Sequence, residues 1–121
     1  TGQFPLTHGL FLNDLRLSRR ATSLGDAFAA GGYDTAWIGK WHVDGTGRDT
    51  PIPPERRQGF AFWRTLECTH DYFPSAYHAD DDPRRRLWPG YDADAQTHEA
   101  IRYVERRAPG DRPFLMVLSW G

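Results

Sequence analysis

Two short apolar runs and two amphipathic segments alternate along the chain. Residues 34–38 (Asp-Thr-Ala-Trp-Ile) contain two β-branched side chains and stop at a glycine, which predicts a buried strand. Residues 114–118 (Phe-Leu-Met-Val-Leu) are continuously apolar, as is typical of a parallel strand covered on both faces. Each run follows a segment whose apolar residues have helical spacing. This alternation predicts an α/β fold.

The first amphipathic segment, residues 23–31, has the end signals of a short helix. Ser23 with Asp26 three positions later matches a capping box, and Gly31-Gly32 supplies a stop. The expected apolar face consists of Leu24, Ala27, Phe28 and Gly31.

The second amphipathic segment, residues 93–107, is the clearer helix. Asp92 or Asp94 can cap its start, and Pro109-Gly110 ends it. Its expected apolar stripe consists of Thr97, Ala100, Ile101, Val104 and Ala108.

The remaining segments have weaker signals. Residues 46–58 contain three prolines and should be irregular. Residues 59–66 are expected to form a short strand with Phe60, Phe62, Arg64 and Leu66 on one side, and residues 67–91 a long connection. Residues 1–20 should be irregular and pack on a core through Leu10, Phe11, Leu12, Leu15 and Leu17.

Together these elements predict a three-layer α/β sandwich with a mostly parallel sheet. Strands 34–38 and 114–119 should lie parallel in that sheet, with helices 23–31 and 93–107 packed on its faces. The chain has 121 residues, enough for one small domain. It begins within an expected turn and ends directly after an apolar run, so we expect it to be part of a larger domain.

Composition and charge narrow the class of protein. The net charge of −1 gives no electrostatic case for binding nucleic acid or an anionic membrane. No apolar run approaches the roughly 20 residues of a membrane span. The single cysteine, Cys68, excludes a disulfide within the chain.

The strongest candidate for chemistry follows the strand 34–38. Lys40 and His42 stand two residues apart at the strand's carboxyl end, where open α/β sheets bind ligands. A cation and an imidazole there suit sulfate or phosphate. Lys40 is the only lysine, because 14 of the 15 Lys and Arg residues are arginines. The competing interpretation is a lysine at a strand end that extends into solvent.

Other candidates are weaker. No H-E-x-x-H, G-x-S-x-G or phosphate-loop motif is present. Cys68 could be a nucleophile beside His70, although a buried packing role is favoured. Three consecutive carboxylates, Asp80-Asp81-Asp82, precede the arginines 84–86. Because these carboxylates lack the alternating spacing of a calcium loop, a solvated charged loop is favoured over a metal site.

Several motifs, in order, carry a resemblance to a known family. Thr1-Gly2 with Pro5, His8-Gly9 and Asn13 resembles the "TG-x-x-P…HG…N" run of the sulfatases. Residues 29–42, which end in Gly39-Lys40-Trp41-His42, resemble the GKWH signature of that family closely. Arg57-Gln58-Gly59-Phe60 is similar to its "RGF" turn, and Asp94 through Pro113-Phe114-Leu115 to its "D-x-A…PFF" run.

The resemblance implies an alkaline-phosphatase-like fold, present here as a partial domain, with residues 1–121 an internal part of a sulfatase catalytic domain. We call the longer protein the parent enzyme. The implied reaction is hydrolysis of a sulfate ester, either a small molecule or a saccharide. The resemblance places Lys40 and His42 at the ester and at the hydroxyl of the nucleophile, and Asn13 near the substrate. We add His70 as a substrate-binding candidate.

The family nucleophile is a formylglycine made from Cys or Ser in a C/S-x-P/A-x-R motif, which this chain lacks. The resemblance implies that it lies upstream. It also implies a divalent metal ion, usually Ca²⁺, whose ligands lie outside this chain, so no residue here is assigned to metal. The aldehyde hydrate would attack sulfur, with Lys40 supplying positive charge and His42 holding or deprotonating the hydrate. The 121-residue chain alone should be inactive. A periplasmic or extracellular location is implied by the resemblance only.

Two alternatives to a sulfatase remain. A phosphodiesterase or phosphonate monoester hydrolase of the same superfamily would share the nucleophile position and the fold. A non-catalytic α/β module that binds oxyanions would keep the pocket without the nucleophile. The sequence does not name the substrate or the oligomeric state. Loop 67–91 is a candidate for substrate selection or equally for packing, through His70, Tyr72, Tyr77, Trp88 and Tyr91.

Overall fold

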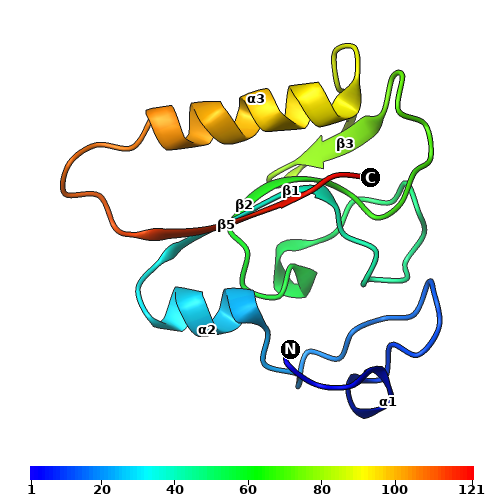
Figure 1. Ribbon diagram of the computed structural model, residues 1–121. Coiled ribbons are helices and arrows are strands. Elements are labelled where there is room, and N and C mark those ends of the chain that lie inside the picture. The colour runs from blue at the N-terminus through cyan, green and yellow to red at the C-terminus, as the bar shows by residue number, and fades with distance from the viewer.

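A five-stranded sheet in the order β4-β3-β2-β1-β5 forms the centre of the computed structural model, which describes all residues, Thr1–Gly121. Helix α3 covers one face of this sheet and helix α2 lies against the other, so the molecule has three layers (Figure 1). The strands are β1 (Asp34–Lys40), β2 (Phe62–Leu66), β3 (Ala76–Ala79), β4 (Asp82–Leu87) and β5 (Phe114–Ser119). The helices are α1 (Pro5–His8), α2 (Leu24–Ala30), α3 (Asp92–Glu105) and the 3₁₀ turn η1 (Pro54–Arg56).

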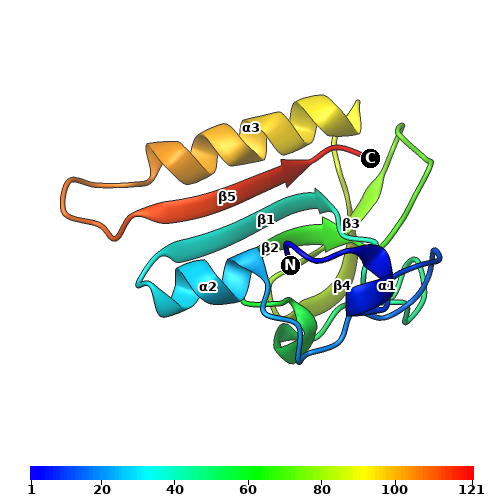
Figure 2. The ribbon, with the colours of Figure 1, turned by 60° about the horizontal axis from the view of Figure 1, so that its bottom comes forward.

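The central strand β1 pairs in parallel with both β2 and β5, which confirms the predicted parallel arrangement. In the register of β1 with β5, Asp34 lies opposite Phe114 and Gly39 opposite Ser119. The carboxyl ends of these three strands therefore meet at one edge. Figure 2 shows the N-terminal segment with α1 at this same end of the sheet.

Two apolar clusters hold the layers together, one on each face of the sheet. On the α3 face, Ile38 of β1 packs with Trp88, Ala95 and Ala100. The opposite cluster consists of Trp41, Ile52, Phe60 and Trp63, and the rings of Trp41 and Trp63 meet edge to face at 5.0 Å. Aromatic pairs in this geometry each contribute about 0.5–1.5 kcal/mol beyond their burial. The residues on either side of Lys40 are thus fixed in rigid structure.

Residues 67–91 were expected to form one long connection without regular structure, and the structure corrects this expectation. Its middle forms an antiparallel hairpin of β3 and β4, and β3 also pairs with β2. The charged run near the hairpin turn is paired: Asp80 contacts Arg64 at 2.6 Å, and Asp81 contacts Arg57 at 2.9 Å. These ion pairs offset the negative charge of the neighbouring carboxylates.

The apolar faces expected for the two helices are also corrected. The capping box of Ser23 and Asp26 is present, yet α2 buries Gly25, and Leu24 is 51% exposed. Gly25 lies so close to Phe60 that a Cβ there would stand 2.7 Å from its ring.

Helix α3 begins after Tyr91 without a side-chain cap, so neither Asp92 nor Asp94 is its N-cap. Its buried face consists of Asp92, Ala95, Gln96, Glu99 and Ala100.

Two further expectations are wrong: the extent of the strand over 59–66 and the packing of residues 1–20. The strand expected over 59–66 begins at Phe62, and Phe60 belongs to the opposite face from Phe62. In residues 1–20, Phe11 is 59% and Leu12 67% exposed, and only Leu17 is buried, so this segment does not pack on the core as expected. No helix of the structure is long and apolar enough to cross a membrane.

The two outer strands of the sheet, β4 and β5, differ in charge. The outer strand β4 carries Arg84, Arg85 and Arg86, and charged edges resist pairing with other chains. The β5 edge is apolar. Beside it, an open groove of about 280 Å³ is lined by Thr97, Ala100, Ile101, Val104, Glu105 and Met116.

We expect the 121-residue chain to associate through the β5 edge, because unpaired backbone groups and apolar side chains lie together there. Ile101 and Val104 are 47% and 44% exposed. Sedimentation velocity over a range of concentrations should show reversible association, and replacing both residues by lysine should shift the chain toward monomer. Arg85→Ala on the opposite edge is the control. A wild-type chain that stays monomeric at all concentrations would contradict the prediction.

Candidate functional site

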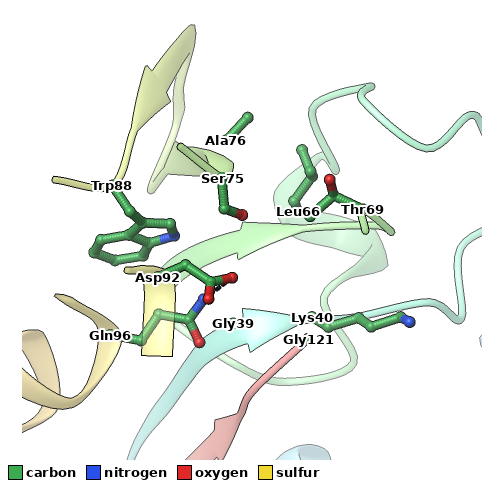
Figure 3. Close-up of a pocket in the computed structure, with 10 residues that line it drawn as sticks. All are labelled: Gly39, Lys40, Leu66, Thr69, Ser75, Ala76, Trp88, Asp92, Gln96 and Gly121. Carbon is green, nitrogen blue, oxygen red and sulfur yellow. Dashed lines mark hydrogen bonds between the residues drawn. The ribbon is translucent and has the colours of Figure 1, made fainter. Parts of the chain in front are cut away.

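The carboxyl ends of β1, β2 and β5 surround a small cavity at one edge of the sheet. Its volume is about 10 Å³, about that of one water molecule. Gly39, Lys40, Leu66, Thr69, Ser75, Ala76, Trp88, Asp92, Gln96 and Gly121 line it (Figure 3). The Oε1 atom of the buried Gln96 has no hydrogen-bond partner. Asp92 Oδ2 accepts from Gln96 Nε2 at 3.4 Å.

Gly39 brings β1 and β5 together at this cavity. Its φ of 101° lies in the region that favours glycine. A Cβ at this position would stand 2.0 Å from the carbonyl oxygen of Ser119 and 2.9 Å from Gln96 Oε1. The glycine before Lys40 is therefore required by the close approach of the neighbouring strand.

Lys40 ends β1 with its charge uncompensated. Its ammonium makes no ion pair in the chain, whereas most of the arginines do. Figure 3 shows the side chain extending away from Asp92 and Gln96. Its carbonyl oxygen accepts a hydrogen bond from Trp37 Nε1 at 3.0 Å, which fixes the backbone. An anion at this edge would therefore find a cation that no carboxylate already neutralises.

His42 is oriented by a carboxylate that the sequence analysis did not single out. The imidazole Nε2 lies 3.1 Å from Asp14 Oδ1, and Arg48 donates to Asp14 Oδ2 at 3.0 Å. The Arg48 hydrogen bond, and then that of His42, holds the pKa of Asp14 below its usual value. Because a carboxylate only accepts hydrogen bonds, Nε2 carries the proton and Nδ1 is left for a ligand.

Glu67 holds the turn that follows His42. Its Oε1 accepts from the backbone N–H groups of Asp44 and Gly45, both at 2.7 Å. The side chain is 1% exposed, and its Oε2 has no partner. Burial raises the pKa of Glu67, opposed by these two hydrogen bonds. Glu67 directly follows β2 and extends the alternation of the buried Trp63 and Thr65, which was a sequence signal for an inward-facing carboxyl.

We expect Glu67→Ala to lower the free energy of unfolding by about 1–3 kcal/mol, because the buried N–H of Asp44 and the partly buried N–H of Gly45 lose their acceptor. Glu67→Gln keeps an acceptor oxygen and should cost less. Because the pKa is raised in the folded state, folding favours the protonated carboxyl. Wild-type stability should fall as pH rises from the ordinary 4.5 through the raised value, and Glu67→Gln should remove this fall.

Urea unfolding of the three chains over that pH range measures both effects. Equal losses in Glu67→Ala and Glu67→Gln would show that the hydrogen bonds to Asp44 and Gly45 contribute nothing.

The other predicted site residues lie near this edge without joining Lys40 or His42. Asn13 is exposed and precedes Asp14 in the chain, so only its neighbour reaches His42. His70 is exposed, with Nδ1 3.4 Å from the hydroxyl of Tyr72. Cys68 is 4% exposed, as its favoured packing role requires. No three His, Cys, Asp or Glu side chains form a group that could hold a metal ion.

Comparison with known proteins matches the chain to a family. The sulfatase family model matches residues 1–120. An ulvan-active sulfatase of Formosa agariphila is 45% identical over 119 residues, which cover 98% of this chain and 23% of the relative. An N-acetylglucosamine-6-O-sulfatase of Bacteroides thetaiotaomicron is 28% identical over 97% of this chain and 19% of its own length.

Solved structures match the fold as well. One, from work on glycosaminoglycan metabolism by Bacteroides thetaiotaomicron, superposes with a TM-score of 0.83 at 25% identity over 99% of this chain and 30% of that chain. Another, in complex with its substrate D-glucosamine-2-N,6-O-disulfate, has a TM-score of 0.75 at 29% identity over 98% of this chain and 22% of that chain. The chain spans 19–26% of the length of the curated relatives that it matches.

Proposed function

Because this chain belongs to the sulfatase family, we propose that its parent enzyme hydrolyses a sulfate ester, with Lys40 and His42 in the sulfate pocket. We propose further that residues 1–121 are an internal part of the catalytic domain. One observation carries the assignment of the pocket: the uncompensated Lys40 ammonium ends β1 two residues before the Asp14-bound His42. A fixed cation and an oriented imidazole at a sheet edge suit an ester that gains negative charge as it reacts.

The two side chains have different roles in this proposal. Lys40 binds the sulfate oxygens and neutralises the charge that develops on them in the transition state. His42 uses Nδ1 to hold or move a proton, while its Nε2–H remains bound to Asp14. Asp14 is a positioning residue, and Arg48 holds Asp14 in turn. Asn13 and His70 are proposed to contact the rest of the substrate.

The family also implies a divalent metal ion, proposed to be Ca²⁺, and a formylglycine. Several carboxylates of this chain are paired with arginines, as Asp44 with Arg56 and Asp80 with Arg64, and no three His, Cys, Asp or Glu side chains form a group that could hold a metal ion. Cys68 is buried and is followed by Thr69-His70-Asp71, which does not fit the modification motif. We propose that the metal ligands and the formylglycine lie in parts of the parent enzyme outside residues 1–121.

A sulfated saccharide is the proposed substrate class. The relatives named above include proteins described as active on ulvan and on N-acetylglucosamine-6-O-sulfate groups, and one structure holds a glucosamine disulfate. The exposed loop that carries His70 adjoins the cavity through Thr69. That position suits a segment that contacts the alcohol part of the ester.

Two other functions make different predictions. A phosphodiesterase or phosphonate monoester hydrolase would use the same Lys40 and His42 on a phosphorus centre. A non-catalytic module would bind oxyanions without turnover. Rates of the parent enzyme on 4-nitrophenyl sulfate and on bis(4-nitrophenyl) phosphate test all three. Preference for the sulfate supports the proposal, preference for the phosphate supports the first alternative, and binding of sulfate with no turnover of either supports the second.

The 121-residue chain alone should not hydrolyse 4-nitrophenyl sulfate, because we propose that the nucleophile and the metal ligands lie elsewhere in the parent enzyme. Release of nitrophenol by the purified chain should equal that of a heat-inactivated sample. Turnover above this background would refute the placement of the nucleophile outside residues 1–121.

A further inference from the structure

The end of strand β2 holds the loop that carries His42 at two points. The carbonyl oxygen of Leu66, the last residue of β2, accepts a hydrogen bond from the backbone N–H of Trp41 at 3.0 Å. The next residue, Glu67, binds the loop two residues after His42, at Asp44. His42 therefore lies between two anchors that consecutive residues provide. Backbone atoms make the first anchor and a side chain makes the second, so a substitution can remove only the second.

The anchor that Glu67 provides is buried and double. One atom, Oε1, accepts from the N–H groups of Asp44 and of Gly45, each at 2.7 Å. Glu67 and Asp44 are each only 1% exposed. Because both hydrogen bonds end on the same atom, they fix the orientation of the peptide group between Asp44 and Gly45 as well as its position.

The backbone of His42 has a conformation that needs such support. Its φ is 56°, and that of its partner Asp14 is 58°, so both residues lie in the left-handed region. This conformation is uncommon for residues with a side chain and persists where the surrounding structure holds it. Loss of an anchor would let the backbone of His42 relax and would move its imidazole.

The turn that follows His42 also supports the segment that carries Asp14. A Cβ on Gly45 would stand 2.6 Å from the carbonyl oxygen of Asp14. Arg16 Nε donates to the carbonyl oxygen of Asp44 at 3.1 Å. The turn thus packs directly on the Asp14 segment. A displacement of the turn would disturb both partners of the hydrogen bond between His42 and Asp14.

We propose that Glu67 is a positioning residue of the parent enzyme, which keeps His42 and Asp14 in the geometry that the reaction needs. This inference rests on the proposed function. The place of Lys40 does not depend on the turn, because Lys40 lies opposite Leu66 in the ladder of β1 with β2. Loss of the Glu67 carboxyl should therefore slow the reaction and leave sulfate binding intact.

Steady-state kinetics of the parent enzyme on 4-nitrophenyl sulfate tests this separation. We expect Glu67→Ala to lower kcat by up to about 10²-fold, the cost of misplacing a reacting group by about 1 Å. The inhibition constant of inorganic sulfate should stay at the wild-type value, because Lys40 keeps its place. Glu67→Gln retains an acceptor oxygen for the two N–H groups and should recover most of kcat. Glu99→Ala, which removes a buried carboxyl from α3, is the control for loss of stability and should keep the wild-type kcat.

A double variant separates positioning from general destabilisation. If Glu67 acts through His42, Glu67→Ala should lower kcat no further in a protein that already carries His42→Ala. A full multiplication of the two losses would overturn the inference, as would a wild-type kcat in Glu67→Ala or an equal loss in Glu99→Ala. Glu67→Asp withdraws the carboxyl by one methylene and should also lose kcat, which keeps the test open if the alanine variant does not fold.

Hydrogen exchange distinguishes failure of this inference from failure of the proposed function. Peptides that cover residues 41–47, followed by mass spectrometry, should exchange faster in Glu67→Ala than in the wild type and should not change in Glu99→Ala. Unchanged exchange of these peptides in Glu67→Ala would overturn the inference. If the parent enzyme hydrolyses no sulfate ester, the proposed function fails, whereas the exchange rates still decide whether Glu67 holds the loop around His42.

Discussion

Replacing Lys40 by alanine should lower kcat/KM of the parent enzyme for a sulfate ester about 10²–10³-fold, the loss found when one preorganised donor to a developing anion is removed. The structure supports so large an effect for two reasons. No carboxylate of this chain forms an ion pair with the Lys40 ammonium. The hydrogen bond from Trp37 Nε1 to the Lys40 carbonyl oxygen fixes the backbone from which the side chain extends. Lys40 is also the only lysine among residues 1–121.

Lys40→Arg should restore only part of this activity. The arginine keeps the charge but spreads it over a wide planar group, which does not fit a pocket shaped for a compact ammonium. Steady-state kinetics of the three proteins on 4-nitrophenyl sulfate provides the measurement, and Arg85→Ala on the distant β4 edge is the matched control for loss of a cation. A kcat/KM close to wild type in Lys40→Ala would place Lys40 on the surface, outside the site.

The central elements could be predicted from the sequence because their signals are local. The apolar runs at 34–38 and 114–118 are long enough to identify strands β1 and β5, and the Ser23–Asp26 capping box identifies the start of α2. Their parallel pairing followed from the intervening helix. Lys40 and His42 were selected as candidates because they stand at the carboxyl end of the apolar run 34–38.

The hairpin of β3 and β4 could not be predicted, because its residues do not have a strand composition. Strand β4 is the sequence Asp-Pro-Arg-Arg-Arg-Leu, which is largely exposed and charged. It forms through its ladder with β3 and through Asp82, which accepts from Arg84 and Arg86 at 2.7 Å each. Tertiary pairing thus overrides a composition that indicates a loop.

The partners of the candidate site also depend on contacts between distant segments. Asp14 lies 28 residues before His42 in the sequence, and no pattern links the two. The family resemblance selected Asn13, whereas in the structure the neighbouring residue, Asp14, makes the hydrogen bond with His42. Glu67 holds the Asp44 backbone across 23 residues. Sequence reasoning proposed Lys40 and His42 as candidates, whereas the contacts that Asp14 and Glu67 make required the fold.

His42→Ala should lower kcat of the parent enzyme about 10²–10⁴-fold, the contribution typical of a general acid or base. Asp14→Asn should have a smaller effect, because it removes the charge that orients Nε2–H while the imidazole remains. The loss of kcat in Asp14→Asn should therefore be a fraction of the loss in His42→Ala. Glu55→Ala, which removes an exposed carboxylate with no ion pair, is the control. Steady-state kinetics of the four proteins on 4-nitrophenyl sulfate decides the matter, since a kcat of His42→Ala close to the wild-type value would assign the proton transfer to another group.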